Sequence, residues 1–266
     1  MSVPTVHPTA IVDSSAVLEA DVKIGPYTVV GAGVKVGAGT TVGAHCVIEG
    51  PTVIGQRNRV GHQCSFGAPP QDLGYKGDPT RLEIGDDNFF GDFVQISRGT
   101  TKNADQTTRI GSRNFIMAYC HVGHDCVLGN NIIAANAVQL AGHVKVEDRV
   151  VFGGTVAIHQ FCRIGTFAMI SGGSVTSLDI PPYCRVGGWG CAVFGLNLIG
   201  LERNGFSRDQ IRRLRDAYKI LFRSSVPYEE ALKKIETEFS DSKEAQNWVK
   251  FFRESDRGVV RERENK

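Results

Sequence analysis

Two histidines and a carboxylate lie within one short stretch of a chain that is otherwise rich in aliphatic residues and glycine. The stretch runs from Cys120 to Cys126 and contains His121, His124 and Asp125. Histidine has a pKa suited to proton abstraction near neutral pH, and an adjacent carboxylate can fix its tautomer and stabilise the imidazolium. We therefore expect chemistry on a small molecule to take place here.

A six-residue repeat predicts the elements that position these residues. An apolar residue recurs at every sixth position from Val6 to Val60, then from Ile84 to Ile96, and in a new phase from Ile110 to Ile170. This period drifts out of step with a helix and is typical of short strands joined by tight turns. The chain is therefore predicted to be mainly β, as a parallel β-helix whose coils each take about eighteen residues.

Departures from the repeat predict loops and a second domain. Residues 67–81 and 97–109 lack the aliphatic spacing, and long loops of this kind often project and carry function. Beyond the hexads, Ser207 and Gln210 form a capping box, Pro227 suits a first helical position, and another helix is expected near Asp241. We predict a β-helix over residues 1–190 and a C-terminal helical domain over residues 191–266.

Composition excludes several classes of function. Thirty Lys and Arg balance twenty-eight Asp and Glu, which argues against a protein that coats nucleic acid. Neither a signal peptide nor a membrane span is recognisable, so we expect a cytoplasmic protein without membrane insertion. Seven cysteines without a Cys-x-x-Cys pair argue against a disulfide framework and a zinc ribbon.

Stacking of the coils predicts which residues meet. His124, Gly142 and Gln160 are eighteen positions apart, as are Asp125 and His143, so each set should lie on successive coils. The expected patch comprises His121, His124, Asp125, Gly142, His143, His159 and Gln160. A glycine N–H one coil from a histidine base can stabilise an oxyanion, which fits acyl transfer to an alcohol.

Three questions stay open at this patch. Neighbouring strand residues point to opposite faces, so Asp125 can orient His124 only if the chain bends there, and otherwise it pairs with His143. Clustered histidines also bind zinc. Gamma-class carbonic anhydrases share this prism but place two ligand histidines five residues apart, whereas His121 and His124 are three apart, and we expect no metal. A prism used only as a scaffold would give four histidines no reason to converge.

The first predicted tail helix is basic. Its only acidic residues are Asp209 and Asp216. Its basic residues are Arg203, Arg208, Arg212, Arg213, Arg215, Lys219 and Arg223. Such a stripe is either a solvated helix face or a docking patch for an acidic partner. We assign Arg212, Arg213 and Arg215 to the docking alternative.

Several motifs resemble one enzyme family. They are Pro70-Gln71-Asp72-Leu73, His121-x-x-His124-Asp125-Cys126, Leu140-Ala141-Gly142-His143-Val144, Ala157-Ile158-His159-Gln160-Phe161-Cys162 and Gly205-Phe206-Ser207-Arg208. Together they are similar to the acyl-carrier-protein–UDP-N-acetylglucosamine O-acyltransferases. The resemblance implies a left-handed prism and a cytoplasmic homotrimer with sites between subunits. It also implies transfer of a 3-hydroxyacyl group from acyl carrier protein to the sugar 3-hydroxyl, the first step of lipid A synthesis, without a cofactor.

The resemblance also implies roles for individual residues. His124 is the general base, Asp125 its orienting partner, and the Gly142 N–H the oxyanion donor. The residues implied to contact donor, sugar or nucleotide are Gln71, Asp72, His121, His143, His159, Gln160, Asn197 and Arg203. Gly172 falls where the family sets acyl-chain length, and a glycine there leaves room for a long chain.

Departures from the family pattern concentrate where the acceptor is recognised. Gly74 stands in place of a lysine, Ser97 of a histidine, Gly123 of an alanine, Ile199 of a glutamate and Asn204 of a basic residue. The acceptor is therefore UDP-N-acetylglucosamine, its 3-amino analogue or another nucleotide-linked sugar. The runner-up enzyme is an acetyl-CoA-dependent sugar acetyltransferase, which predicts no basic docking helix.

Overall fold

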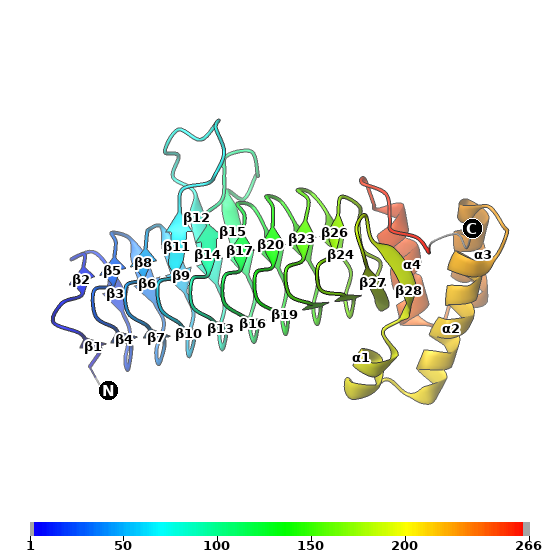
Figure 1. The fold of residues 1–266 in the computed structure, drawn as a ribbon, viewed down its shortest axis with the longest axis horizontal. Coiled ribbons are helices and arrows are strands. Elements are labelled where there is room, and N and C mark those ends of the chain that lie inside the picture. Colours follow the sequence, from blue (N-terminus) through cyan, green and yellow to red (C-terminus); the bar gives the residue numbers. More distant parts are fainter. Residues whose placement is uncertain (1–2, 263–266) are drawn as a thin grey trace.

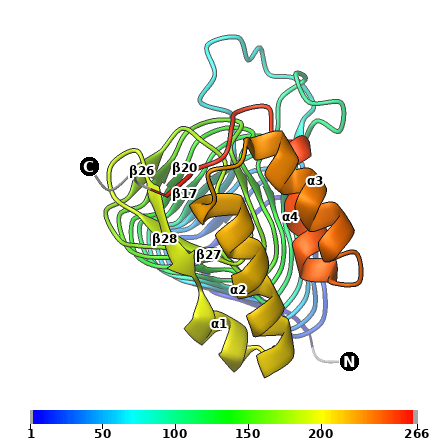
Figure 2. The ribbon, with the colours of Figure 1, turned by 90° about the vertical axis from the view of Figure 1, so that its right-hand side faces the viewer.

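The chain forms a triangular prism of stacked coils with a group of helices at its C-terminal end (Figure 1). The computed structural model describes residues 3–262. Strands pair in parallel with strands one coil away, so that His121 of one coil lies opposite Gln139 of the next. The predicted left-handed parallel β-helix is confirmed, and Figure 2 shows its coils nested behind the helices.

Each of the three faces of the prism is one sheet. The first face holds β1 (Thr5–Val6), β4 (Lys23–Ile24), β7 (Thr41–Val42), β10 (Arg59–Val60), β13 (Phe89–Phe90), β16 (Phe115–Ile116), β19 (Ile133–Ala134), β22 (Val151–Phe152), β25 (Met169–Ile170), β27 (Cys184–Gly187) and β28 (Ala192–Leu196). The second face holds β2 (Ile11–Val12), β5 (Val29–Val30), β8 (Val47–Ile48), β11 (Ser65–Ala68), β14 (Gln95–Ser97), β17 (His121–Val122), β20 (Gln139–Leu140), β23 (Ala157–Ile158) and β26 (Val175–Thr176). The third face holds β3 (Val17–Leu18), β6 (Val34–Val36), β9 (Thr52–Ile54), β12 (Arg81–Ile84), β15 (Thr107–Ile110), β18 (Val127–Leu128), β21 (Lys145–Val146) and β24 (Arg163–Ile164).

One inward aliphatic residue per strand builds the core. Ile116, Val122 and Leu128 lie on the three faces of one coil and are all buried. Each stacks on its counterpart in the neighbouring coils, so the core is a continuous column of apolar side chains, mostly aliphatic. This is why the six-residue spacing predicted the fold.

Corners between faces use a left-handed backbone. At many corners the third residue after the inward aliphatic has a positive φ, as at Asp125 (60°), His143 (62°) and Phe161 (66°). This conformation is uncommon for residues other than glycine and turns the chain sharply. These three residues stack along the corner between the second and third faces.

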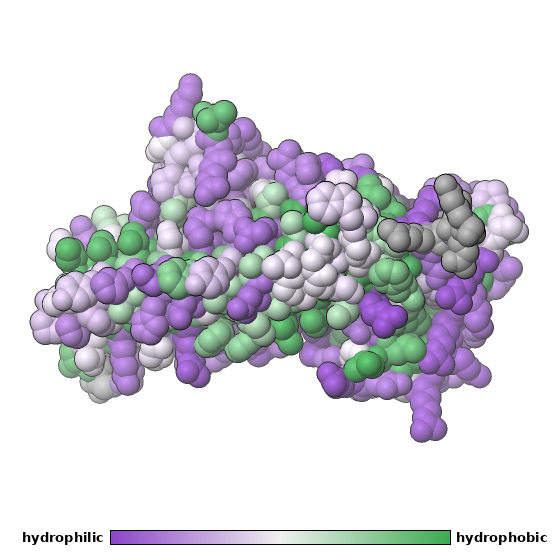
Figure 3. Space-filling view, viewed as in Figure 1, coloured by the Kyte–Doolittle hydropathy of each residue, from purple (hydrophilic) through white to green (hydrophobic). Residues whose placement is uncertain are grey.

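Both predicted loops leave the prism at that same corner, in consecutive coils. One connects β11 to β12 and the other connects β14 to β15, and they project side by side (Figure 1). Figure 3 shows them as a largely hydrophilic protrusion. The next corner along the prism, from β17 to β18, carries His124 and Asp125. The loops therefore stand directly beside the candidate site.

Helices close the C-terminal end of the prism. They are α1 (Leu198–Arg203), α2 (Arg208–Arg223), α3 (Tyr228–Glu238) and α4 (Lys243–Arg253). The capping box of Ser207 and Gln210 is confirmed, whereas Pro227 is the residue before α3 rather than its first. The buried Trp248 of α4 donates its indole N–H to the Pro182 carbonyl at 2.8 Å, which ties the helices to the last coil.

Three local features differ from the expectation or were not foreseen. Ser242, rather than Asp241, caps α4. The antiparallel hairpin of β27 and β28 and the short helix α1 were not predicted, and the hairpin turn contains residue 190. The glycines at 187, 188 and 190 masked these short strands in the sequence. Within residues 3–262, no helix has the length and apolar character needed to cross a membrane.

Candidate active site

The corner between β17 and β18 brings a histidine and a carboxylate into direct contact. The Nδ1 atom of His124 lies 2.8 Å from Oδ2 of Asp125, and the Asp125 side chain is fully buried. The Nε2 atom of His143 lies farther from the same oxygen, at 3.5 Å. The positive φ at Asp125 is the bend that this pairing requires, so Asp125 contacts both histidines but bonds more closely to His124.

Thr100 from the second loop completes the surroundings of the carboxylate. Its N–H donates to Oδ1 of Asp125 at 2.8 Å and its hydroxyl donates to Oδ2 at 2.7 Å. Burial raises the pKa of the Asp125 carboxyl, but hydrogen bonds from His124 and Thr100 outweigh burial, so this pKa lies below its ordinary value. An ionised carboxylate only accepts, so His124 carries its proton on Nδ1 and presents the lone pair of Nε2.

Gly142 lies against the ring of His124, as the eighteen-residue spacing predicted. A Cβ atom at Gly142 would fall 2.7 Å from Cε1 and 2.8 Å from Nε2 of His124. Such distances are too short for carbon, so only glycine fits without displacing the imidazole. The free nitrogen of the imidazole therefore faces the backbone of the next coil.

The N–H of Gly142 is a backbone donor close to the His124 ring. At some other corners the second residue after the inward aliphatic donates to a side-chain oxygen one coil ahead, as His62 does to Asp92 at 2.7 Å and Asn130 does to Asp148 at 2.7 Å. Within the described residues, the Gly142 N–H has no such acceptor. It is therefore free to donate to a ligand beside His124.

Two further predicted histidines belong to this cluster. The His143 ring meets His124 edge-on at 5.2 Å between centroids and stacks on Phe161 at 4.4 Å. Burial lowers the pKa of His143, against the opposing charge of Asp125. Burial also lowers the pKa of His121, which points outward from β17, and the charge of His124 lowers it further.

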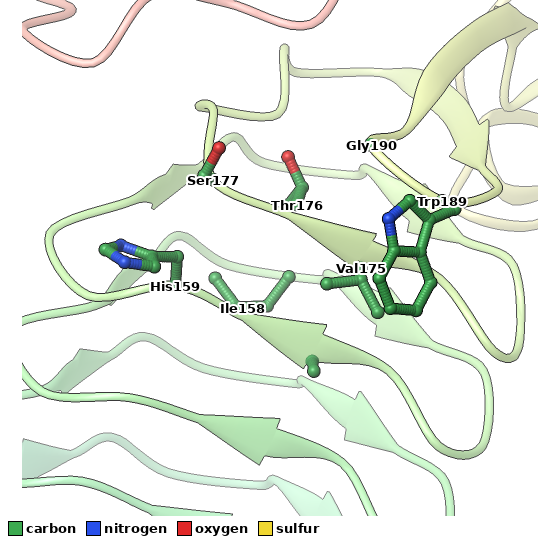
Figure 4. Close-up of a pocket in the computed structure, with 8 residues that line it drawn as sticks. Ile158, His159, Val175, Thr176, Ser177, Trp189 and Gly190 are labelled. Carbon is green, nitrogen blue, oxygen red and sulfur yellow. The ribbon is translucent and has the colours of Figure 1, made fainter.

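His159 and Gln160 lie on the coil next to Gly142 and His143, as the eighteen-residue spacing predicted. Both are exposed, and Nδ1 of His159 lies 3.2 Å from the Gln160 carbonyl. His159 lines a separate hollow of about 330 Å³ between β23 and the β27–β28 turn, opposite the exposed Trp189 (Figure 4). Across residues 3–262, no ring contact or hydrogen bond joins His159 to the other three histidines. His159 is therefore one coil beyond His143 but outside the group of residues that contact Asp125.

The two loops place a second charged pair beside the cluster. The Nζ atom of Lys102 lies 2.5 Å from Oδ2 of Asp72, and the Gly74 N–H donates to Oδ1 at 2.8 Å. The hydrogen bond from Lys102 lowers the pKa of Asp72, and the Gly74 N–H adds to the effect. Gln71 is exposed. Sequence reasoning missed Lys102 and Thr100, because loop residues have no repeat from which to infer a partner.

A groove of about 860 Å³ runs from the charged pair along the third face. Lys102, Asp125, His143 and Phe161 line the end nearest the loops, and Lys145 and Arg163 lie farther along. A volume of this size falls within the range of ligand sites. The cluster is thus open to solvent on one side and covered by the loops on the other.

The residues predicted near the nucleotide lie at the helical end. Asn197 caps α1, accepting from the Gly200 N–H at 3.2 Å, and it donates to the Phe167 carbonyl at 3.0 Å. Arg203 is exposed at the end of that helix. Arg149 donates to the side chain of Asn204, so a guanidinium that the sequence did not indicate stands beside this position.

The remaining predicted residues have distinct surroundings. Gly172 is exposed in the turn after β25. Arg213 of α2 pairs with Asp241 and stacks over Phe239 at 5.3 Å, so its guanidinium takes part in helix packing. Arg212 pairs with Asp209 of its own helix. Arg215 has no partner among the described residues and is exposed.

The cluster also satisfies the distance requirement of a metal site. His124, Asp125 and His143 offer ligand atoms that all lie within 4.8 Å of one another. However, Oδ2 of Asp125 already accepts from His124 and Thr100, and Oδ1 accepts from the Thr100 N–H. These donors leave the carboxylate little capacity for a cation, so the set fits an oriented base better than a metal centre.

Comparison with known proteins relates the prism and the helices to one family. Residues 179–260 match the family model described as UDP N-acetylglucosamine O-acyltransferase, domain 2, and residues 15–50 match the bacterial transferase hexapeptide model. The acyl-[acyl-carrier-protein]–UDP-N-acetylglucosamine O-acyltransferase of Herminiimonas arsenicoxydans is 46% identical over 96% of this chain and 99% of its own. The enzyme of the same name from Halorhodospira halophila is 44% identical, with coverage of 96% and 99%.

Solved structures agree with these relatives. A UDP-N-acetylglucosamine acyltransferase from Francisella novicida superposes with a TM-score of 0.94 at 35% identity, over 97% of this chain and 94% of its own. The acyltransferase from Campylobacter jejuni gives 0.92 at 39% identity, over 97% and 100%. The coils and the helical end are thus shared with these solved structures. This chain belongs to the acyl-[acyl-carrier-protein]–UDP-N-acetylglucosamine O-acyltransferase family.

Proposed function

We propose that this acyltransferase moves a 3-hydroxyacyl group from acyl carrier protein to the 3-hydroxyl of UDP-N-acetylglucosamine, with His124 as general base. The reaction class and the two substrates are supported by the names of the full-length relatives. The observation that carries the role of His124 is its pairing with the buried Asp125 while its Nε2 faces Gly142. In this proposal the reaction is the first step of lipid A synthesis.

The chemistry needs one base and one oxyanion donor. His124 Nε2 takes the proton of the acceptor hydroxyl as the hydroxyl oxygen attacks the thioester carbonyl carbon. The carbonyl oxygen becomes negative, and the Gly142 N–H donates to it. As the carbon–sulfur bond breaks, the carrier thiolate leaves and takes the proton from the imidazolium. Asp125 stabilises that imidazolium throughout.

No cofactor or metal enters this mechanism. A thioester is already activated, so a base, an oxyanion donor and positioning suffice. The acyl donor is carried on the phosphopantetheine of acyl carrier protein. In this proposal Asp72 and His121 contact the sugar, His143 and His159 line the acyl and sugar site, and Gln160 helps to hold the donor or the nucleotide.

The remaining parts of the proposal concern partners and location. Arg215 and its neighbours on α2 dock the acidic carrier protein, and Arg215 is the residue of that set with no partner of its own within residues 3–262. We also infer a cytoplasmic homotrimer in which a second subunit covers the groove beside His143. A covering subunit would exclude water from the acyl transfer, which strengthens the electrostatic contacts there.

The test is product analysis with a matched pair of variants. The parent should convert acyl carrier protein thioester and UDP-N-acetylglucosamine to an ester, detected by mass spectrometry. His124→Ala should lower kcat by about 10²–10⁴-fold without changing the melting temperature. His45→Ala removes a histidine at a different corner, where its ring stacks on Tyr27, and should leave kcat unchanged.

Other outcomes have defined meanings. Activity of His124→Ala within tenfold of the parent would reject the base assignment. If only the 3-amino analogue is acylated, to give an amide, then that analogue is the acceptor instead of UDP-N-acetylglucosamine. Transfer from acetyl-CoA at the rate seen with the carrier thioester would favour the sugar acetyltransferase instead.

A further inference from the structure

The charged pair between the two loops is tied to the catalytic corner by a continuous chain of hydrogen bonds. Asp125 accepts from both the N–H and the hydroxyl of Thr100, and the Thr100 hydroxyl in turn accepts from the Lys102 N–H at 3.2 Å. Lys102 then reaches Asp72 in the other loop at 2.5 Å. The backbone of Lys102 is therefore held by the same residue that supports the orienting carboxylate.

Gly74 leaves the space that the lysine occupies. A Cβ atom at Gly74 would lie 3.3 Å from Oδ1 of Asp72 and 3.7 Å from Nζ of Lys102. Any longer side chain at position 74 would start at the edge of this ion pair. The sequence lacks the lysine expected at that position, and the ammonium beside Asp72 comes from the second loop instead.

The geometry of the pair suits substrate contact better than stabilisation. The Lys102 side chain is 61% exposed, and ion pairs this open contribute little to folding. Asp72 is only 14% exposed and has both oxygens fixed, one by Lys102 and one by the Gly74 N–H. A carboxylate has about four acceptor sites, so Asp72 can still accept from sugar hydroxyls beside His124.

We propose that Lys102 is a positioning residue for the acceptor, which fixes the Asp72 carboxylate against the nucleotide sugar in place of a cation at position 74. This rests on the proposed function, in which Asp72 contacts the sugar. The ammonium also offsets the repulsion between Asp72 and the anionic diphosphate of the acceptor. Lys102 acts through Asp72 and takes no part in proton transfer.

The test separates positioning from structural support by steady-state kinetics. Lys102→Met should raise the KM for UDP-N-acetylglucosamine by about tenfold, the worth of one hydrogen bond to a charged group. The kcat, the KM for acyl carrier protein and the melting temperature should stay close to those of the parent. Lys76→Met is the matched control, because Lys76 is exposed in the same loop as Asp72 and has no partner among the described residues.

Rescue by a relocated lysine is the decisive measurement. Gly74→Lys in the Lys102→Met background should return the KM toward that of the parent, since the new side chain starts beside Asp72. An unchanged KM in Lys102→Met would overturn the proposal. A lowered melting temperature with a parallel loss of kcat would also overturn it, in favour of a loop staple. A parent that does not acylate UDP-N-acetylglucosamine would refute the acceptor itself, and the proposal with it.

Discussion

Replacing Gly142 by alanine tests the catalytic corner at a single atom. Gly142 does not have a positive φ, so the backbone accepts alanine without strain, and the conflict comes only from the new Cβ. That atom would lie 2.7 Å from Cε1 of His124, where ordinary contact begins at 3.4 Å. The imidazole must therefore move by about 0.7 Å, or the corner must open by as much.

The cost follows from how sharply proton transfer depends on distance. A misplacement of about 1 Å can cost about 10²-fold in rate, so Gly142→Ala should lower kcat by about ten- to a hundredfold. The KM for either substrate should change little, because the residues proposed to hold the substrates lie elsewhere. Steady-state acyl-transfer rates at saturating concentrations of both substrates measure this kcat directly.

A control and a double variant exclude a general loss of structure. Gly154 is also the second residue after an inward apolar residue, but on another corner, where a new Cβ would meet the Asn136 carbonyl at 3.4 Å. Gly154→Ala should keep full activity. In a His124→Ala background, Gly142→Ala should cost little more, because the displaced group is already absent. Equal losses in both backgrounds, or a Gly142→Ala enzyme within twofold of the parent, would refute the contact.

Three further predictions address the carboxylate, the docking helix and pH. Asp125→Asn should lower kcat by about 10²–10⁴-fold, because an amide can donate to Nδ1 of His124 and leave the imidazole proton on Nε2. Asp87→Asn, at another corner of positive φ, is its control. Similar kcat values for the two variants would contradict the pairing of Asp125 with His124. Arg215→Glu should raise the KM for acyl carrier protein, more strongly at low salt, while Lys233→Glu on α3 should not. If the KM of both variants depends equally on salt, α2 is a solvated helix face and not a docking patch. Burial places the pKa of His143 below its unfolded value of about 6.5. The unfolded chain therefore binds more protons as pH falls through 6.5, and stability is lost there. The melting temperature of His143→Gln should fall less than that of the parent between pH 7.5 and 5.5, and an equal fall in both would argue against the lowered pKa of His143.

The prism was predictable because its core obeys one rule. Ile116, Val122 and Leu128 fill the same role on three faces, so the spacing alone placed strands and corners. The corner bend had a signal as well. Gly33 and Gly39 stand third after an inward valine and have φ values of 70° and 71°. Asp125 is third after Val122, so the bend that pairs it with His124 could have been inferred from those glycines.

The four histidines lie on three consecutive coils, as their spacing predicted, but only two of them contact Asp125. His143 is the third residue after Leu140 and lies on the corner, next to Asp125. His159 is the first residue after Ile158, and its side chain lines the hollow on the second face rather than the groove that His143 lines. Eighteen-residue spacing fixes the coil, whereas the position within the hexad fixes the direction. A prediction that used both would have placed His159 on the neighbouring coil but in a different hollow from His143.

The division between prism and loops also separates the chemistry from its selectivity. His124 and Gly142 lie on adjacent coils, so the distance between base and oxyanion donor is set by the strand spacing of about 4.8 Å. No substitution in a loop can change that distance, because the aliphatic column fixes the stacking. Lys102, Asp72 and Gly74 lie in loops that follow no repeat, and a cation can move from one loop to the other without disturbing a coil. The part of acceptor choice that depends on Asp72 should therefore lie in residues 69–80 and 98–106, and exchanging both loops together should change the preferred sugar while kcat for that sugar stays high.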